Sequence, residues 1–540
     1  GLLSFNAAVT YQNVTATPLT EDNTPQLTSL NITGDTVDMP FAFQDTAYVY
    51  VGYVRNSADS VNIVYKTTNA DARVSVADAK GNVHEPEDGT VSVPVANRGT
   101  DARNEGLNQY SLTVEDPDTG AVAVYQLRVF CEGPDDTYYY EDQRSQFHYS
   151  VKNGWGNDPC GLVRTSDGVY HFYYQAYTDT DWGPMHWGYA TSTDLVHWKE
   201  QPIALYPDEY GAQFSGCGVY ADHTTAPEIF AEGEEGMVFI VTANGRAGQD
   251  GKQRLTLAYA TYDPDTKTMG AYQKYDDVLL DYSTDDIIEP ADGAFRDPKV
   301  FRFDGKWFLI VAGGPVRFYS SDDLVHWKGE SYLNEPGTEN HVYTECPDLY
   351  PVKAEDGTVK WILSRGGTSY KVGEFENVGS TNVEGGQYAF VQDKGTPDYT
   401  MNFGRDAYAA MTYFNAGSDF GTSGSVNCPE LVAMNWMNTW DYNKLVQNTG
   451  NWRFNGTYNL PVKLGLTQDS DGAYRLTQDP VDKLDDLRDE SGKVTVDGLK
   501  LGGDDAVTPI DFNGTSYEIE ATFTPGKGEQ PTVGFDVRVG

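Results

Sequence analysis

Three acidic residues of this 540-residue chain lie in short phrases whose composition suits chemistry. Asp158 stands in Trp-Gly-Asn-Asp-Pro, Asp297 in Phe-Arg-Asp-Pro and Glu345 in Thr-Glu-Cys-Pro. Carboxyl groups that converge can divide the work, one attacking as a nucleophile and another transferring protons. A single Asp-Pro in an acidic chain is ordinarily a turn. Because several such phrases occur, we interpret them as parts of one catalytic site.

The spacing of the phrases indicates a site assembled from successive units. Two further phrases belong to the set, Phe214-Ser215-Gly216 and Phe403-Gly404-Arg405-Asp406. The separations from Asp158 to Ser215, Asp297, Glu345 and Asp406 in turn are 57, 82, 48 and 61 residues. Equivalent positions in the repeated sheets of a propeller meet near its axis. We therefore expect each unit to contribute one phrase to a single funnel.

A repeated phrase reveals the elements that must position these residues. Ser192–Glu200 reads STDLVHWKE and Ser321–Gly329 reads SDDLVHWKG, seven identities in nine positions at an offset of 129 residues. Apolar runs recur more often, at Val169–Gln175, Met237–Thr242, Lys306–Ala312, Val359–Ser364 and Ala407–Tyr413. Five similar β-units predict a five-bladed β-propeller. We expect His197 and His326 of the repeated phrase to be packing residues of a structural turn.

The remainder of the chain also has the pattern of β-strands. Alternating apolar runs separated by Gly, Asp and Asn lie at Ala47–Val54, Val61–Thr67, Thr90–Val95 and Val122–Phe130. We expect an all-β chain with an independent N-terminal β-sandwich at residues 1–132, a linker at 133–145, the propeller at 146–480, a linker at 481–504 and the start of an incomplete C-terminal β-sandwich at 505–540.

Composition excludes some classes of partner. Eighty Asp and Glu against 38 Lys and Arg give a formal charge of -42, which repels polyanions such as nucleic acid. No run approaches 18 consecutive apolar residues, so we expect no membrane insertion. No glycine-rich phosphate loop or paired Cys and His motif is present, so we expect no cofactor and no metal. Aromatic residues make up 13%, which suits either sugar stacking or a tyrosine-rich sheet.

At these phrases the sequence resembles glycoside hydrolase family 32, the invertases, inulinases and levanases that cleave β-fructofuranosyl linkages. The likeness covers about residues 146–480 and also includes Met185–Gly188 and Asn435–Met437. It implies a retaining hydrolase that acts on levan, inulin or sucrose through a covalent fructosyl-enzyme intermediate. Separately, Ala121–Val129 resembles the last strand of cadherin-like or immunoglobulin-like modules in bacterial surface and secreted proteins. We therefore expect a secreted or cell-surface protein.

The resemblance implies a role for each acid. Asp158 would be the nucleophile, Glu345 the general acid/base, and Asp297 the carboxylate that holds sugar hydroxyls and stabilises the transition state. The residues implied to hold the terminal fructosyl unit are Asn157, Gln175, Trp182, Phe214, Ser215 and Arg296, although Trp182 has an alternative as blade core. In a retaining enzyme the nucleophile and the acid lie about 5 to 5.5 Å apart and must titrate apart.

Two cysteines depart from the pattern of the family. Cys160 stands where the family usually has Asn after Asp-Pro, and Cys217 where Ser usually ends the Phe-Ser-Gly phrase. They either form a disulfide or are small side chains buried around the axis. We favour the second interpretation.

Several functional alternatives stay open. A fructotransferase would use the same site, because water and sugar compete for one intermediate. A catalytically silent sugar-binding propeller would not need a matched nucleophile and acid, and an arabinan-cleaving propeller fits the Trp-x-Asn-Asp-Pro phrase poorly. The stretch Gly366–Thr400 is interpreted as an aromatic overhang that favours levan over inulin and sucrose, or as an ordinary blade connection. The oligomeric state is left open.

Overall fold

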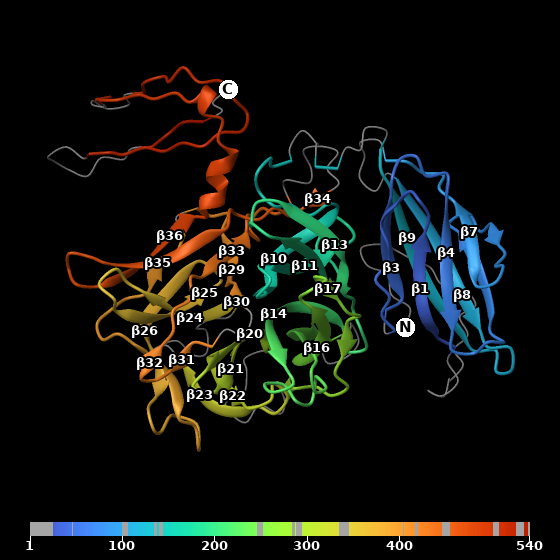
Figure 1. Cartoon of the computed structure of the whole chain (residues 1–540), viewed down its shortest axis with the longest axis horizontal. Coiled ribbons are helices and arrows are strands. Elements are labelled where there is room, and N and C mark those ends of the chain that lie inside the picture. Colours follow the sequence, from blue (N-terminus) through green and yellow to red (C-terminus); the bar gives the residue numbers. More distant parts are fainter. Residues whose placement is uncertain are drawn as a thin grey trace. The chain divides into compact units, whose positions relative to one another are not determined.

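The computed structural model of the chain is built almost wholly of β-strands (Figure 1). It describes residues 25–45, 47–99, 106–133, 138–139, 144–245, 252–282, 287, 294–333, 345–402, 404–415, 419–444, 454–500, 507–524 and 534–537. The described helices are the short 3-10 helices η4 (Asp482–Leu487) and η5 (Glu490–Gly492). Within the described residues, no helix has the length and apolar character needed to cross a membrane.

Two sheets form the N-terminal region. Their strands are β1 (Leu27–Thr33), β2 (Val37–Met39), β3 (Val49–Val54), β4 (Ser60–Thr67), β5 (Arg73–Asp78), β6 (Val83–His84), β7 (Thr90–Pro94), β8 (Leu107–Glu115) and β9 (Val122–Cys131). One sheet has the order β1-β4-β7 and the other β2-β3-β9-β8-β5-β6. Alternation along β8 and β9 directs every second side chain inward, so that Leu112 and Leu127 share a buried core with Ile63 of the other sheet. This is the packing of a β-sandwich.

Five further sheets follow one another from residue 154 to residue 480 (Figure 1). The first holds β10 (Gly154–Arg164), β11 (Tyr170–Tyr177), β12 (His186–Ser192) and β13 (Trp198–Leu205). The second holds β14 (Ala212–Asp222), β15 (Glu235–Asn244), β16 (Gln253–Asp263), β17 (Thr268–Met269), β18 (Gln273–Lys274) and β19 (Leu280–Asp281). The third holds β20 (Arg296–Phe303), β21 (Lys306–Ala312), β22 (Val316–Ser321) and β23 (Lys328–Leu333).

The last two of these sheets are less regular. The fourth holds β24 (Pro347–Lys353), β25 (Val359–Arg365), β26 (Ser369–Asn377), β27 (Tyr388–Gln392) and β28 (Tyr399–Thr400). The fifth holds β29 (Tyr408–Thr412), β33 (Val432–Trp436), β35 (Val462–Gln468) and β36 (Tyr474–Pro480). The short strands β30 (Phe414–Asn415) and β34 (Phe454–Asn455) pair with β10, and β31 (Gly421–Thr422) pairs with β32 (Ser425–Val426).

The first strands of the five sheets contact one another in a closed ring, β10 to β14, β14 to β20, β20 to β24, β24 to β29 and β29 back to β10. A central strand such as β21 (KWFLIVA) is buried along nearly its whole length, because neighbouring sheets cover both of its faces. Antiparallel sheets arranged in this way define a β-propeller. The prediction of an all-β propeller fold is confirmed.

The five apolar runs of the sequence are not equivalent strands. The first four correspond to β11, β15, β21 and β25, the second strand of their sheets. The fifth run, Ala407–Tyr413, contains β29, which is an innermost strand. In the fifth sheet the next strand, β33, comes only after the hairpin of β31 and β32. The sequence spacing is therefore shorter than one full unit at this point.

The repeated phrase forms the same turn twice, between β12 and β13 and between β22 and β23. In the first copy, Oδ1 of Asp194 accepts hydrogen bonds from the backbone N–H groups of Val196 and His197. Asp323 does the same in the second copy. The side chains of His197 and His326 are exposed and bond the Asp carboxylates, so the expectation that they pack in a core is wrong. Both residues lie in the short connections between strands, where their rings face solvent.

The stretch Gly366–Thr400 is part of the fourth blade. It forms β26, β27 and β28, and its rings lie in a core cluster with Trp361. The buried rings are Tyr370, Phe375, Tyr388 and Phe390, and Tyr399 is partly buried beside Arg475. The interpretation as an aromatic overhang is therefore wrong, because the same apolar residues stabilise the blade.

The sandwich and the first blade share contacts and belong to one compact unit, residues 1–484. Tyr206, which follows β13, is buried in the core cluster of the sandwich. Nζ of the buried Lys152 lies 2.5 Å from Oδ2 of Asp38 and 3.3 Å from Oε1 of Glu132. The sandwich therefore contacts the first blade, and the predicted domain boundaries stay a prediction.

Residues 485–540 form a second unit. Among its described residues no strand is formed, and the run Tyr517–Thr522, expected to be a strand, has no pairing partner. Part of the other expected strand, Val533–Val539, lies outside the described residues. A strand depends on a neighbour for its backbone hydrogen bonds. The C-terminal sandwich stays a prediction.

Candidate active site

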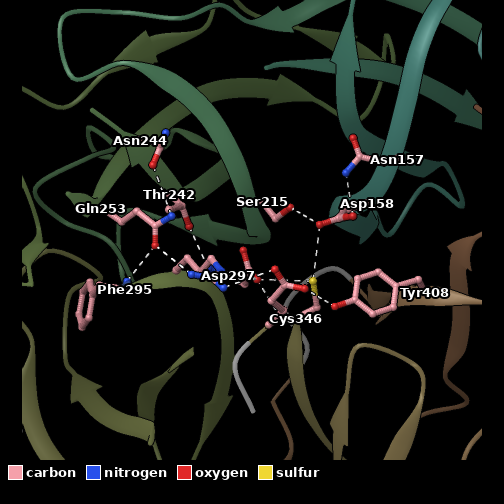
Figure 2. Close-up of polar contacts among 12 residues, drawn as sticks. Asn157, Asp158, Ser215, Thr242, Asn244, Gln253, Phe295, Asp297, Cys346 and Tyr408 are labelled. Atoms are coloured by element: carbon pink, nitrogen blue, oxygen red, sulfur yellow. Dashed lines mark hydrogen bonds and ion pairs between the residues drawn. The ribbon is translucent and has the colours of Figure 1, made fainter. Parts of the chain in front are cut away.

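Asp158 is buried near the start of β10 and is held by two hydrogen bonds (Figure 2). Oγ of Ser215, from β14, donates to its Oδ2 at 2.6 Å. Nδ2 of Asn157 donates to its Oδ1 at 2.8 Å, and Nε1 of Trp155 fixes that amide by donating to Oδ1 of Asn157 at 2.6 Å. Burial raises the pKa of Asp158, and the Ser215 and Asn157 hydrogen bonds oppose that rise. The two hydrogen bonds therefore limit the rise in the pKa and hold the carboxylate in one orientation.

Asp297 lies at the start of β20 in a strained conformation with φ 56°. Its backbone N–H donates to Oγ1 of Thr242 at 2.9 Å, and its Oδ2 accepts from the backbone N–H of Cys346 at 2.9 Å. Burial raises the pKa of Asp297 to about 7, with the guanidinium of Arg296 opposing and Asp158 adding to the rise. Backbone strain of this kind is typical of functional sites.

Glu345 lies two residues before β24 and is the most accessible of the three acids, with 38% of its side chain exposed. Nη2 of Arg296 lies 3.4 Å from its Oε1, and the hydroxyl of Tyr408 donates to its Oε2. Burial raises the pKa of Tyr408, which keeps this hydroxyl protonated as a donor. The carboxyl is therefore held in place on two sides and open to a substrate on another.

The thiol of Cys346 lies between two of the acids (Figure 2). Its Sγ is 3.5 Å from Oδ2 of Asp158 and 3.5 Å from Oδ2 of Asp297. Burial raises the pKa of Cys346, so the group stays a neutral thiol with one proton to donate. The Glu-Cys phrase therefore supplies two groups: the accessible carboxyl of Glu345, and the thiol of Cys346 as a proton donor to Asp158 and Asp297.

Irregular pairing at the inner strands brings these side chains together. The register shifts between Gly156 and Pro159 in β10, Phe214 and Gly216 in β14, Arg296 and Lys299 in β20, and Tyr408 and Met411 in β29. In the fourth sheet, Cys346 adopts φ 47° just before β24. A bulge re-aims a side chain that regular alternation would direct elsewhere. Each inner strand thus carries an irregularity next to its functional residue.

The predicted substrate-holding residues divide into two groups. Asn157, Ser215 and Arg296 contact the acids directly. Trp182 is 36% exposed, so its alternative as blade core is wrong, and its ring meets that of Phe214 edge to face at 5.7 Å. Gln175 is buried, and its amide donates to the backbone oxygen of Gln213 at 2.8 Å. Gln175 thus holds the backbone of β14 one residue before Phe214.

The fifth phrase does not join the site. Arg405 pairs with Asp441 at 2.7 Å, and the exposed Asp406 accepts a hydrogen bond from Tyr442. Phe403 lies outside the described residues, as does Thr344. The fifth blade instead contributes Tyr408, two residues further along the chain. The sequence did not single out Tyr408, because it lies in an apolar run directly after the acidic phrase.

Two supporting residues were also missed. Thr242, on β15, accepts from the backbone of Asp297, and Gln253, on β16, accepts from the backbone of Phe295 at 2.9 Å and from Arg296 at 3.3 Å. Neither lies in a recognisable phrase, because each acts on the backbone or side chain of a neighbouring blade. Since Arg296 contacts both Asp297 and Glu345, these two acids already have a cation from the chain itself.

All five cysteines are free thiols, and Cys160 and Cys217 are buried. The interpretation of Cys160 and Cys217 as small buried side chains is therefore confirmed over the disulfide. Sγ of Cys160 lies 3.5 Å from the backbone oxygen of Asp158 and 3.7 Å from Nε2 of Gln175. Cys160 thus packs directly against the backbone of Asp158.

Comparisons with known proteins agree with the site. Residues 148–480 match the family described as Glycosyl hydrolases family 32 N-terminal domain. The match covers more than half of the chain, and the chain belongs to this family.

Relatives and a solved structure extend the likeness. A fructan beta-fructosidase of Streptococcus mutans is 41% identical over 548 residues, covering 100% of this chain and 36% of that protein. A levanase of Bacillus subtilis is 31% identical, covering 76% of this chain and 57% of that protein. The crystal structure of an exo-inulinase from Aspergillus awamori shows 25% identity and a TM-score of 0.51, covering 64% of this chain and 68% of that chain. The chain thus spans about a third to just over half of the length of these two relatives.

Proposed function

We propose that this protein is a retaining glycoside hydrolase that cleaves β-fructofuranosyl linkages of fructans or sucrose. The observation that carries the proposal is the set of three acids in different settings, Asp158 buried and hydrogen-bonded, Asp297 buried beside it, and Glu345 accessible. The names of the two relatives refer to fructan and levan, and hydrolysis of such polymers agrees with this set of three acids.

The geometry supports a division of roles in the first step. The carboxylate of Asp158 attacks the anomeric carbon of the fructosyl unit while Glu345 gives its proton to the bridging oxygen, so that the leaving sugar departs as a neutral alcohol. The bond from carbon to the leaving oxygen breaks as the bond to Asp158 forms. The accessibility of Glu345 suits it to the leaving group, which lies toward solvent.

The second step reverses the proton transfer. Glu345, now ionised, takes a proton from water, and the resulting hydroxide displaces Asp158 from the anomeric carbon. Asp297 is placed to accept hydrogen bonds from hydroxyls of the sugar ring, and the rings of Trp182 and Phe214 offer an apolar wall to its carbon face. We also propose that the protein acts outside the cell, because Ala121–Val129 resembles the last strand of modules in bacterial surface and secreted proteins.

The test is to incubate the purified chain with levan, inulin and sucrose and to identify the products by chromatography. Release of fructose or short fructan chains from at least one substrate is the expected result. Longer transfer products would instead indicate the fructotransferase alternative. No turnover, with retained binding of fructan, would contradict the proposal in favour of a silent sugar-binding propeller.

A further inference from the structure

A buried ion pair lies deeper in the propeller than the three acids and has no part in the steps above. Nζ of Lys299 is 3.2 Å from Oδ2 of Asp348, and the two side chains are 0% and 1% exposed. Lys299 follows Asp297 by two residues on β20, and Asp348 follows Glu345 by three residues on β24. The pair therefore joins β20, which carries Asp297, to β24, which begins two residues after Glu345.

A third strand is tied to the same pair. Nζ of Lys299 donates to the backbone oxygen of Thr412 at 3.0 Å. Oδ2 of Asp348 accepts from both the backbone N–H and Oγ1 of Thr412, each at 2.8 Å. Thr412 lies on β29, the strand that begins with Tyr408, the donor to Glu345. The ion pair of Lys299 and Asp348 therefore connects β20, β24 and β29, the strands whose residues surround Glu345.

These ties matter because the inner strands β20, β24 and β29 belong to separate sheets. They have no backbone ladder between them, so side chains must fix how one blade lies against the next. Near the substrate the link is the hydrogen bond from Cys346 to Asp297, and deeper in the axis it is the ion pair. A buried ion pair is weak as a stabiliser, since two apolar residues serve as well, but its geometry is specific.

The surroundings leave the pair intact. Burial lowers the pKa of Lys299, and the charge of Asp348 opposes that change. Cys217 of β14 also faces Lys299, and burial raises the pKa of its thiol to about 12, so that it stays neutral and does not compete for the ammonium group.

We propose that Lys299 and Asp348 are positioning residues that set the placement of the acid/base Glu345 through the three inner strands. This inference rests on the proposed function. It predicts a defect in protonation of the leaving group, since a displacement of about 1 Å in a catalytic group can cost on the order of a hundredfold in rate.

The test compares two substrates in the full-length protein. Sucrose needs protonation of its leaving group, whereas an aryl β-fructofuranoside with a nitrophenol leaving group needs little. Lys299→Met and Asp348→Asn are expected to lower kcat on sucrose about a hundredfold, and to lower the initial burst of nitrophenol less than tenfold. Thr412→Val, which removes only a hydroxyl, should give a smaller loss with the same preference and remains available if the first variants do not fold.

Lys371→Met is the matched control. Lys371 is also buried and pairs with Asp398, but it lies on β26, away from the inner strands. It should lower stability without separating the two substrates. Equal losses on both substrates in folded Lys299 and Asp348 variants, or no loss, would overturn the inference alone. A wild-type protein inactive on both fructosides would overturn the proposed function and the inference with it.

Discussion

The backbone N–H of Cys346 donates a 2.9 Å hydrogen bond to Oδ2 of Asp297. This bond joins the residue next to the acid/base with the acid proposed to hold the sugar, across two blades. The bond therefore links the start of β24 to the start of β20.

Asp158→Asn should reduce turnover of sucrose at least a thousandfold, because an amide cannot form the covalent intermediate. The amide fits the same hydrogen-bonding site, so thermal unfolding should change little. Asp406→Asn is the control, since Asp406 stands in the fifth phrase but lies outside the site, and it should keep full activity. Steady-state kinetics of both variants decides the matter, and more than a few percent residual activity in Asp158→Asn would exclude the nucleophile role.

Tyr408→Phe should lower kcat about ten- to a hundredfold, the equivalent of a hydrogen bond to a charged group. The ring still packs against Trp155 and Trp436, so the protein should fold normally. Tyr442→Phe removes a similar bond from tyrosine to carboxylate outside the site, at Asp406, and should leave kcat unchanged. If both variants behave alike, Tyr408 does not act on Glu345.

Asp297→Asn should stabilise the protein at neutral pH. The folded pKa of Asp297 is about 7, above its ordinary 3.8, so the folded state binds more protons than the unfolded state between these values. The charged carboxylate therefore costs stability progressively as pH rises from 4 to 7, up to about 4 kcal/mol. Urea unfolding of the wild type and the variant should give similar free energies at pH 4 and diverge by pH 7. A difference that does not change with pH would contradict the shifted pKa.

Phe375→Ala should destabilise the protein by about 3 to 5 kcal/mol, because the ring fills the core of the fourth blade. The ratio of kcat/KM on levan to that on sucrose should not change, since no overhang is removed. Trp182→Ala is the contrasting variant. It should lower kcat/KM with little effect on unfolding, because its ring is partly exposed beside Phe214. A loss of kcat/KM on levan but not on sucrose in Phe375→Ala would instead support the interpretation of Gly366–Thr400 as an overhang.

The double variant Asp38→Asn and Glu132→Gln should lower the free energy of unfolding by about 3 kcal/mol, because it removes both carboxylates that pair with the buried Lys152. Sucrose kinetics of the folded protein should stay at the wild-type level, since none of these residues contacts the acids. Changes in kcat would show that the sandwich shapes the site.

The acids were predictable because each stands in a short local phrase, whereas the groups that hold them were not. Asp158 and Asp297 could be identified from the residues next to them in the sequence. Thr242 and Gln253 could not, because they act from another blade. Tyr408 was missed because it follows the acidic Asp406 and lies in an apolar run. Strand alternation could not place these side chains, because the register shifts within the inner strands at that level. The propeller itself was readable from recurrent apolar runs, but the aromatic run around Phe375 fits a core or an exposed surface equally well until its neighbours are known.

The pairing of β10 with β30 and β34 has a consequence for how activity arises during synthesis. The strand with Asp158 is made first among the blades, yet its neighbours Phe414–Asn415 and Phe454–Asn455 are made about 250 and nearly 300 residues later. A growing chain on the ribosome therefore carries Asp158 through nearly 300 residues of translation before its sheet is complete. Enzymatic activity in ribosome-stalled chains should appear once residue 480, the end of β36 in the fifth sheet, has left the exit tunnel, which makes turnover a reporter of ring closure.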